Sequence, residues 1–205
     1  MRLTGSCAGA LALPYSGRMN TASTLAIPLA ALMLGPPAAA RAASFCAGLD
    51  SYKVSPIIGG APVDLCRVDA RAVLLVNTAS ACGFTPQYEG LEKLHQRFGR
   101  DGLRVVALPA NDFGSQERGS NQQIAEFCQV NYGVTFTVGE KLTTPIRSDP
   151  LYARLVRTSG KAPKWNFHKY LITPDGRVQS FDSDVTPQSR ELVQAIEVAL
   201  KPAAR

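Results

Sequence analysis

The sequence lacks the cysteine and histidine patterns of common metal and dithiol sites. It has five cysteines but no C-x-x-C pair, the spacing used by zinc sites and by thiol-disulfide oxidoreductases. Its two histidines, His95 and His168, are not spaced like paired metal ligands. These absences argue against a metal site and against a dithiol exchanger.

Acidic residues are missing from the first 42 positions, which carry three arginines instead. The run from Thr24 to Leu34 is apolar, and Gly35-Pro36-Pro37 ends it. Ala40-Arg41-Ala42 has the small-x-small form of a cleavage site. Residues 1–42 are therefore predicted to be a cleaved secretory signal peptide, and residues 43–205 a single domain.

The alternative reading of this segment is a membrane anchor. A spanning helix needs about 20 apolar residues, and Pro28, Pro36 and Pro37 interrupt this run. We therefore expect no stable membrane insertion and an exported protein, periplasmic or secreted. Met19 is a second candidate start, because the apolar run follows it closely.

No block of lysine and arginine is present. The formal net charge is +6 and falls to +3 without the three arginines of residues 1–42. This modest excess is spread along the chain, so no nucleic-acid partner is expected.

Apolar runs alternate with helix signals along the rest of the chain. Residues 72–77 and 103–108 are continuous apolar runs, typical of buried strands. The expected order is strand 72–77, a helix from the Thr85-Pro86 cap to Gly99, strand 103–108, a helix from the Ser120 capping box to Gly133, short strands 134–138 and 141–144, helix 149–158, strand 167–173, strand 177–181 and a last helix capped by Thr186-Pro187. This order predicts an α/β fold: a thioredoxin-like sandwich, with a mixed central sheet flanked by helices.

Cys82 is the candidate nucleophile. It follows the first central strand and precedes a helix, where free N–H groups and the helix dipole stabilise an anionic sulfur. Residues 82–85 read C-x-x-T, so no local thiol is at hand to resolve an oxidised Cys82. A lone thiolate suits attack on an electrophilic oxygen. The alternative is an inert buried cysteine.

Three segments, in this order, resemble the motifs of the glutathione peroxidase family. Residues 77–85 read NTASACGFT, residues 108–117 read LPANDFGSQE and residues 165–171 read WNFHKYL. The resemblance covers roughly residues 50–200. It implies a peroxidase that reduces hydrogen peroxide and organic hydroperoxides and needs no metal or organic cofactor, since sulfur carries the two electrons.

The resemblance also carries the family's catalytic tetrad onto four positions. They are Cys82 as the nucleophile, Gln116, Trp165 and Asn166. Amide and indole N–H groups are neutral donors, which would stabilise the thiolate and the charge that develops as the O–O bond breaks. Taken singly, a lone tryptophan is usually a packing residue and Gln116 a loop amide; the joint match favours catalysis.

Cys128 is the candidate resolving cysteine. On residues alone, a core cysteine is the alternative, because Cys128 falls on an apolar helix face. Its position resembles that of the resolving cysteine in the yeast and plant branches of the family. The implied cycle oxidises Cys82 to a sulfenic acid, which Cys128 attacks, and a thioredoxin-like protein or glutathione reduces the disulfide. The helix would have to unwind locally, because a disulfide requires Cα atoms within about 7 Å.

Other features of the chain bear on its partners. It lacks the longer insertions that tetrameric members of the family use at their interfaces, so the resemblance implies a monomer that favours thioredoxin over glutathione. Cys46 and Cys66 would be the remaining thiols after export, and we expect them to form a structural disulfide. Two free buried cysteines, or Cys66 as the true resolving thiol, are the alternatives.

Two rival functions would use the same cysteine. A thiol-disulfide oxidoreductase is disfavoured by the missing C-x-x-C pair. A peroxide sensor or redox relay, which passes its disulfide to a partner protein, would need the same residues and stays open.

Overall fold

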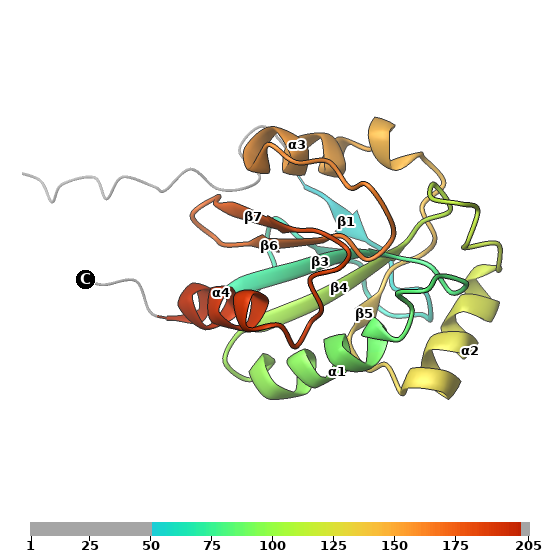
Figure 1. The fold of residues 1–205 in the computed structure, drawn as a ribbon, viewed down its shortest axis with the longest axis horizontal. Coiled ribbons are helices and arrows are strands. Elements are labelled where there is room, and N and C mark those ends of the chain that lie inside the picture. The colour runs from blue at the N-terminus through green and yellow to red at the C-terminus, as the bar shows by residue number, and fades with distance from the viewer. Residues whose placement is uncertain (1–50, 202–205) are drawn as a thin grey trace, which may run out of the picture. The chain divides into compact units, whose positions relative to one another are not determined.

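A computed structural model of the protein describes residues 51–201 (Figure 1). The elements in chain order are β1 (Lys53–Val54), β2 (Val63–Asp64), β3 (Ala72–Thr78), α1 (Gln87–Phe98), β4 (Leu103–Pro109), α2 (Asn121–Tyr132), β5 (Thr137–Val138), the 3-10 helix η1 (Ile146–Ser148), α3 (Pro150–Ser159), β6 (Lys169–Ile172), β7 (Val178–Phe181) and α4 (Arg190–Leu200).

The central sheet has five strands in the order β5-β4-β3-β6-β7. The strands β3, β4 and β5 are parallel, whereas β6 pairs antiparallel with both β3 and β7. All seven residues of β3 are buried, as expected for the middle strand of a sheet covered on both faces. The predicted α/β fold with a mixed sheet is confirmed.

Two hydrophobic cores cover the two faces of this sheet. One core holds the inward faces of α1, α2 and α4. The other holds α3 and residues of the small β1–β2 hairpin. Figure 1 shows α3 on the opposite side of the sheet from α1 and α4. Because β3 and β4 are parallel, their carboxyl ends lie at the same end of the sheet. The loops that follow the two strands meet there.

Helix ends agree with the sequence at α2 and differ at α1 and α4. The predicted capping box of α2 is present, with the Ser120 hydroxyl accepting from the Gln123 N–H and the Gln123 side chain accepting from the Ser120 N–H. The predicted Thr186-Pro187 cap of α4 is wrong. The Thr186 carbonyl accepts from the Ser189 N–H in a turn, and the Ser189 hydroxyl caps the helix instead.

The Thr85 hydroxyl does not cap α1. It accepts from the Cys82 N–H and donates to the Ala79 carbonyl, within the preceding turn. The helix begins at Gln87, one residue later than the predicted first helical residue, Pro86.

The predicted strands after α2 are mostly absent. Residues 134–138 contribute only the two residues of β5. Residues 141–144 form no strand. The Lys141 N–H donates to the Asn121 side chain, and the Leu142 N–H donates to the Pro109 carbonyl. The sequence also gave no sign of the β1–β2 hairpin.

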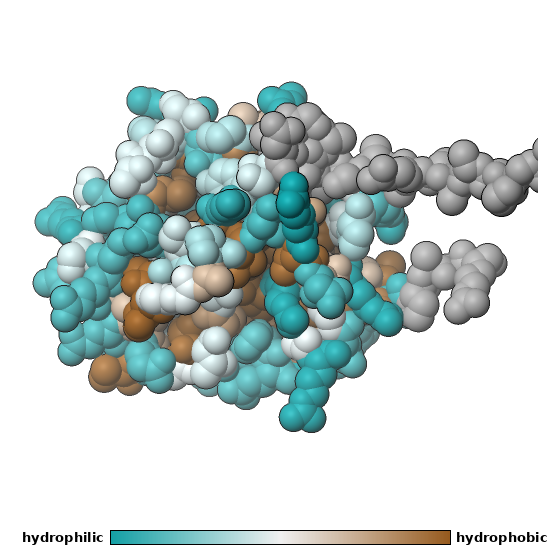
Figure 2. Space-filling view, turned by 180° about the vertical axis from the view of Figure 1, so that it is seen from behind, coloured by the Kyte–Doolittle hydropathy of each residue, from teal (hydrophilic) through white to brown (hydrophobic). Residues whose placement is uncertain are grey.

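Nothing in residues 51–201 forms a helix long and apolar enough to cross a membrane. Hydrophilic side chains cover most of the face in Figure 2, and hydrophobic ones show between them in small separate areas. The predicted signal peptide, residues 1–42, lies outside the described residues.

Candidate active site

Cys82 lies in the turn that joins the end of β3 to α1. Thr85 closes this turn: its Oγ1 accepts from the Cys82 N–H at 3.0 Å, and its own N–H donates to the Cys82 carbonyl at 3.0 Å. The Phe84 N–H points at the sulfur, with 3.4 Å between N and Sγ. The thiol is free and 8% exposed. A backbone donor is therefore in place to stabilise a thiolate close to the protein surface.

A second loop, after β4, brings Gln116 to this turn. The Ala81 N–H donates to the Gln116 carbonyl at 3.0 Å, which ties the two loops together beside Cys82. The Asn166 side-chain NH₂ donates to Gln116 Oε1 at 2.9 Å and to the Phe113 carbonyl at 3.3 Å. Because the Gln116 oxygen is occupied by Asn166, its NH₂ group faces away and stays a donor for another group.

Asn77, near the end of β3, holds the segment that carries Trp165 and Asn166. Its side-chain NH₂ donates to the Trp165 carbonyl at 3.0 Å, and its carbonyl accepts from the Phe167 N–H at 2.6 Å. Phe167 has a φ of +62°, a conformation that costs energy for a bulky side chain. These bonds hold that strained turn in place, so Asn166 points toward Gln116.

Trp165 lies at the rim of the site. Its side chain is 38% exposed, and its ring packs near that of Phe113, with 6.0 Å between the ring centroids. Gly114 has a φ of +66°, and a Cβ there would lie 3.3 Å from the Trp165 ring and 3.4 Å from Gln116 Cγ. A glycine is therefore needed where this loop approaches two of the four predicted catalytic residues.

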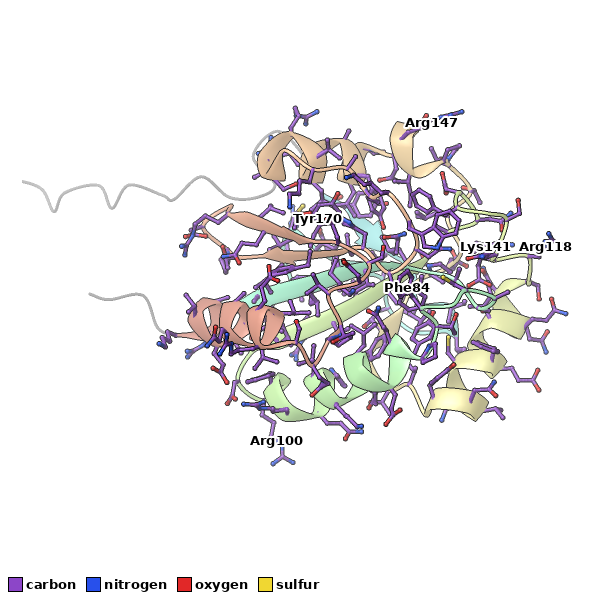
Figure 3. All side chains as sticks on the ribbon, viewed as in Figure 1. Phe84, Arg100, Arg118, Lys141, Arg147 and Tyr170 are labelled. Carbon is purple, nitrogen blue, oxygen red and sulfur yellow. The ribbon has the colours of Figure 1, made fainter. Side chains whose placement is uncertain are left out.

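A surface pocket of about 620 Å³ opens beside the Cys82 turn. Its walls are Ser80 and Ala81 of that turn, the loop 114–119, and the side chains of Gln123, Ile124 and Phe127 on α2. Lys141 braces the loop, with its Nζ 2.6 Å from the Gly119 carbonyl. Arg118 lines this pocket, and Figure 3 shows Arg118 and Lys141 on the same side of the molecule.

Glu117 lies at the candidate site, although no role was predicted for it from the sequence. It is 1% exposed and lines the pocket, and its Oε2 accepts from the Ser80 hydroxyl at 3.1 Å. Burial raises the pKa of this carboxyl, and the bonds from Ser80 and the charge of Lys141 offset part of that effect. Its position directly after Gln116 was the available signal, but a charged loop residue ordinarily faces water.

Cys128 lies on α2 and is also a free thiol, 2% exposed. Burial raises its pKa to about 11, helped by the charge of Glu117 and opposed by the neighbouring Tyr88 hydroxyl. The structure thus brings Gln116 and Asn166 into contact and ties the Gln116 loop to the Cys82 turn, but it leaves Cys82 and Cys128 unbonded. The expected pairing of Cys66 with Cys46 stays a prediction, because Cys46 lies outside the described residues.

His168 directly precedes β6 and is buried. Its Nε2 lies 2.8 Å from the Ser180 hydroxyl, and its Nδ1 lies 3.5 Å from Asp182 Oδ1. Burial lowers its pKa to about 4, although Asp182 opposes the shift. Within residues 51–201, no group of three His, Cys, Asp or Glu side chains is arranged to hold a metal ion.

Comparison with known proteins places the chain in a family. Residues 50–156 match the glutathione peroxidase family model. The glutathione peroxidase-like peroxiredoxin HYR1 of Saccharomyces cerevisiae is 41% identical over 157 residues, which is 73% of this chain and 96% of the yeast protein. The hydroperoxy fatty acid reductase Gpx2 of Synechocystis sp. is 43% identical over 146 residues, which is 70% of this chain and 94% of that protein.

The fold agrees with this result. The crystal structure of Trgpx in its apo form superposes with a TM-score of 0.58 at 32% identity, covering 79% of this chain and 98% of the other. With a thioredoxin-like sheet, a free cysteine at the end of β3 and matches over nearly the whole length of its relatives, the chain belongs to the glutathione peroxidase family and is a thiol peroxidase.

Proposed function

We propose that Cys82 is the peroxidatic cysteine and that Gln116, Trp165 and Asn166 complete its site. The observation that carries this assignment is the junction of the two loops, where the Gln116 carbonyl holds the residue before Cys82 and Asn166 orients the Gln116 amide. The Cys82 thiolate attacks the peroxide, a sulfenic acid forms, and water or an alcohol leaves. N–H donors around the sulfur stabilise the charge that develops as the O–O bond breaks.

Cys128 resolves the sulfenic acid in this proposal, and a thioredoxin-like protein reduces the resulting disulfide. The free state of both thiols supports it, since the reduced enzyme must begin with two thiols. The Cys128 side chain on α2 is buried in the core, so its attack on the sulfenic acid requires part of that helix to unwind. Reduction by glutathione is the alternative.

The proposed substrates are hydrogen peroxide and organic hydroperoxides. A fatty acid hydroperoxide is the organic substrate we favour, because Arg118 lines the open pocket beside the Cys82 turn and carries a charge that attracts a carboxylate. The name of the Synechocystis relative, a hydroperoxy fatty acid reductase, points the same way.

The mature protein is proposed to be an exported monomer, periplasmic or secreted, with a structural Cys46–Cys66 disulfide. Its support is that Cys66 is disulfide-bonded whereas Cys82 and Cys128 are free. A disulfide outside the catalytic pair is typical of oxidising compartments.

The direct test is peroxide turnover with a thioredoxin system and with glutathione, measured side by side at equal reducing equivalents. We expect thioredoxin to support turnover and glutathione to support little. Cys82→Ser is the matched control, and it should abolish turnover with either reductant because a hydroxyl is a far weaker nucleophile at neutral pH. Turnover of Cys82→Ser within threefold of wild type would refute the assignment.

A further inference from the structure

Glu117 is a buried carboxylate that forms no ion pair within residues 51–201. One of its oxygens, Oε2, accepts from the Ser80 hydroxyl. The other, Oε1, is buried and has no hydrogen-bond partner among these residues. An unpartnered polar atom in a protein interior destabilises the fold, so its presence calls for an explanation.

The carboxylate lies between the two elements that carry the catalytic thiols. Through Ser80 it bonds to the turn that holds Cys82, two residues away. On its other side its charge acts on Cys128 of α2 and on Tyr88 of α1, and it raises the pKa of both groups. It also lines the surface pocket together with Ser80 and Ile124 of α2. Glu117 is thus fixed beside the Cys82 turn, where Cys128 must arrive to attack Cys82.

The resolving step needs such a group. It joins a Cys82 sulfenic acid to a Cys128 thiol and gives a disulfide and water, so the thiol must lose one proton and the departing hydroxide must gain one. The pKa of Cys128 is raised to about 11 while it is buried, and even an exposed thiol, with a pKa of about 8.5, is mostly protonated at neutral pH. Only the thiolate is a good nucleophile. Without a base, the step would be slow.

We propose that Glu117 moves this proton: its carboxylate accepts the proton of the Cys128 thiol and delivers it to the hydroxide that leaves Cys82. An S–S bond forms and the S–O bond breaks; the Cys128 sulfur is oxidised, the Cys82 sulfur is reduced, and Glu117 ends as it began. The inference rests on the proposed two-cysteine cycle and adds the residue that makes its second step fast.

The surroundings of Glu117 suit this role. Burial raises the pKa of the Glu117 carboxyl. A higher pKa makes the carboxylate a stronger base toward the Cys128 thiol. The titratable and charged groups that face it are Tyr88 from α1, Cys128 from α2 and Lys141 from the loop before η1. The charge of Lys141 opposes the effect of burial on the pKa of Glu117.

The test separates oxidation from resolution. Reduced enzyme is mixed with one equivalent of hydrogen peroxide and quenched over time, and mass spectrometry counts the dimedone-trapped Cys82 sulfenic acid and the Cys82–Cys128 disulfide. Glu117→Gln keeps the size of the side chain and an oxygen for the Ser80 hydroxyl. We expect it to form the sulfenic acid within about threefold of the wild-type rate and the disulfide at least tenfold more slowly, within the range for a lost general base.

The matched control is Glu126→Gln, an exposed glutamate on α2, which should leave both rates unchanged. Glu117→Ala gives a second readout that a purely structural role would not produce. Formate, a small carboxylate that the open pocket admits, should restore its disulfide formation in a concentration-dependent way. Wild-type rates of sulfenic acid formation show in the same experiment that each variant is folded.

Two results would overturn the proposal. One is disulfide formation in Glu117→Gln within threefold of wild type. The other is a slow Glu117→Ala variant that formate does not rescue, which would leave Glu117 a structural residue. Failure of the proposed function looks different: wild-type enzyme itself would form no Cys82–Cys128 disulfide.

Discussion

Single hydrogen bonds at the carboxyl ends of β3 and β4 set up the Cys82 site. The Phe84 N–H donates to the sulfur, and the Asn166 side chain fixes the direction of the Gln116 amide. Neither bond adds a formal charge, so the site stabilises an anion with neutral dipoles. Donors of this kind cost the enzyme no reorganisation when charge develops on the reacting atoms.

Trp165→Phe should slow the oxidation of Cys82 at least tenfold. The substitution keeps the aromatic body that packs near Phe113 and removes the indole N–H. One donor to a developing anion contributes about 10²–10³ in rate in other enzymes. The measurement is quenched-flow alkylation of Cys82, because Trp165 is the single tryptophan of the chain and its fluorescence is lost. An unchanged oxidation rate would remove Trp165 from the site; an unchanged Tm would show that the fold survives.

His168 should make the stability of the protein depend on pH in the acid range. Its pKa is about 4 in the folded protein and about 6.5 when unfolded. The unfolded chain therefore binds more protons between these values, so this contribution is complete above about pH 6.5 and is lost as the pH falls toward 4. Burial of the neutral ring against Ser180 is the cause.

Urea unfolding at pH 7 and pH 4.5 tests this prediction. Between these two conditions, wild type should lose about 2 kcal/mol more of its free energy of unfolding than His168→Gln, which keeps a polar group but does not titrate. Equal losses in the two proteins would show that His168 is not the titrating group.

The sequence motifs named residues of the candidate site but not the contacts between them. The motifs pointed to Gln116 and Asn166, and the structure joins their side chains. Glu117 was missed because its burial depends on Ser80 and α2, which come from other parts of the chain. Local sequence carries no sign that a charged loop residue will be covered in this way.

At the scale of elements, the proposed cycle makes two opposing demands on α2. The helix must hold Cys128 in the core of the reduced enzyme, and it must release Cys128 once Cys82 is oxidised. The capping box at Ser120 and the left-handed Gly133 at the other end stabilise the helix. The stability of α2 should therefore set the rate of resolution.

Ser120→Ala and Gly133→Ala should each speed disulfide formation. Loss of the cap costs about 1 kcal/mol, and alanine at a φ of +58° costs about the same. If unwinding precedes resolution, each kcal/mol raises the open population and the rate about fivefold. Quenched mass spectrometry gives the rate, and amide exchange in α2 gives the opening. Faster exchange without faster disulfide formation would show that unwinding does not limit the step.

The elements themselves show which signals a sequence carries. The capping box of α2 could be predicted because all its atoms come from four consecutive residues. The start of α1 could not be predicted, because the Thr85 hydroxyl donates to the Ala79 carbonyl within the Cys82 turn. The strand expected at 141–144 does not form for a similar reason, since the Lys141 N–H donates to the side chain of Asn121 and not to another strand.

At the scale of the whole molecule, alternating apolar runs and helix caps were enough to predict the sandwich. Continuous burial of β3 and the parallel pairing with β4 follow from the two apolar runs and the crossover helix between them. The β1–β2 hairpin was not predictable in this way, because its strands have two residues each, too few to set a period.

We predict a Cys46–Cys66 disulfide, separate from catalysis, in the proposed exported form of the protein. Structural disulfides have lower reduction potentials than catalytic ones, so thioredoxin should open the Cys82–Cys128 bond and leave this one closed. A peptide map of periplasmic protein, made after peroxide and again after thioredoxin, tests the pairing. The crosslink should be present in both samples; free thiols at both positions in each would rule it out.

The most direct measurement is a peptide map of the reduced protein after one equivalent of hydrogen peroxide. The two-cysteine cycle predicts one new crosslink, Cys82–Cys128, that thioredoxin removes, and in Cys128→Ser a sulfenic acid that stalls at Cys82 and over-oxidises with more peroxide. An unmodified Cys82 thiol after peroxide, or a crosslink from Cys82 to Cys66, would contradict it.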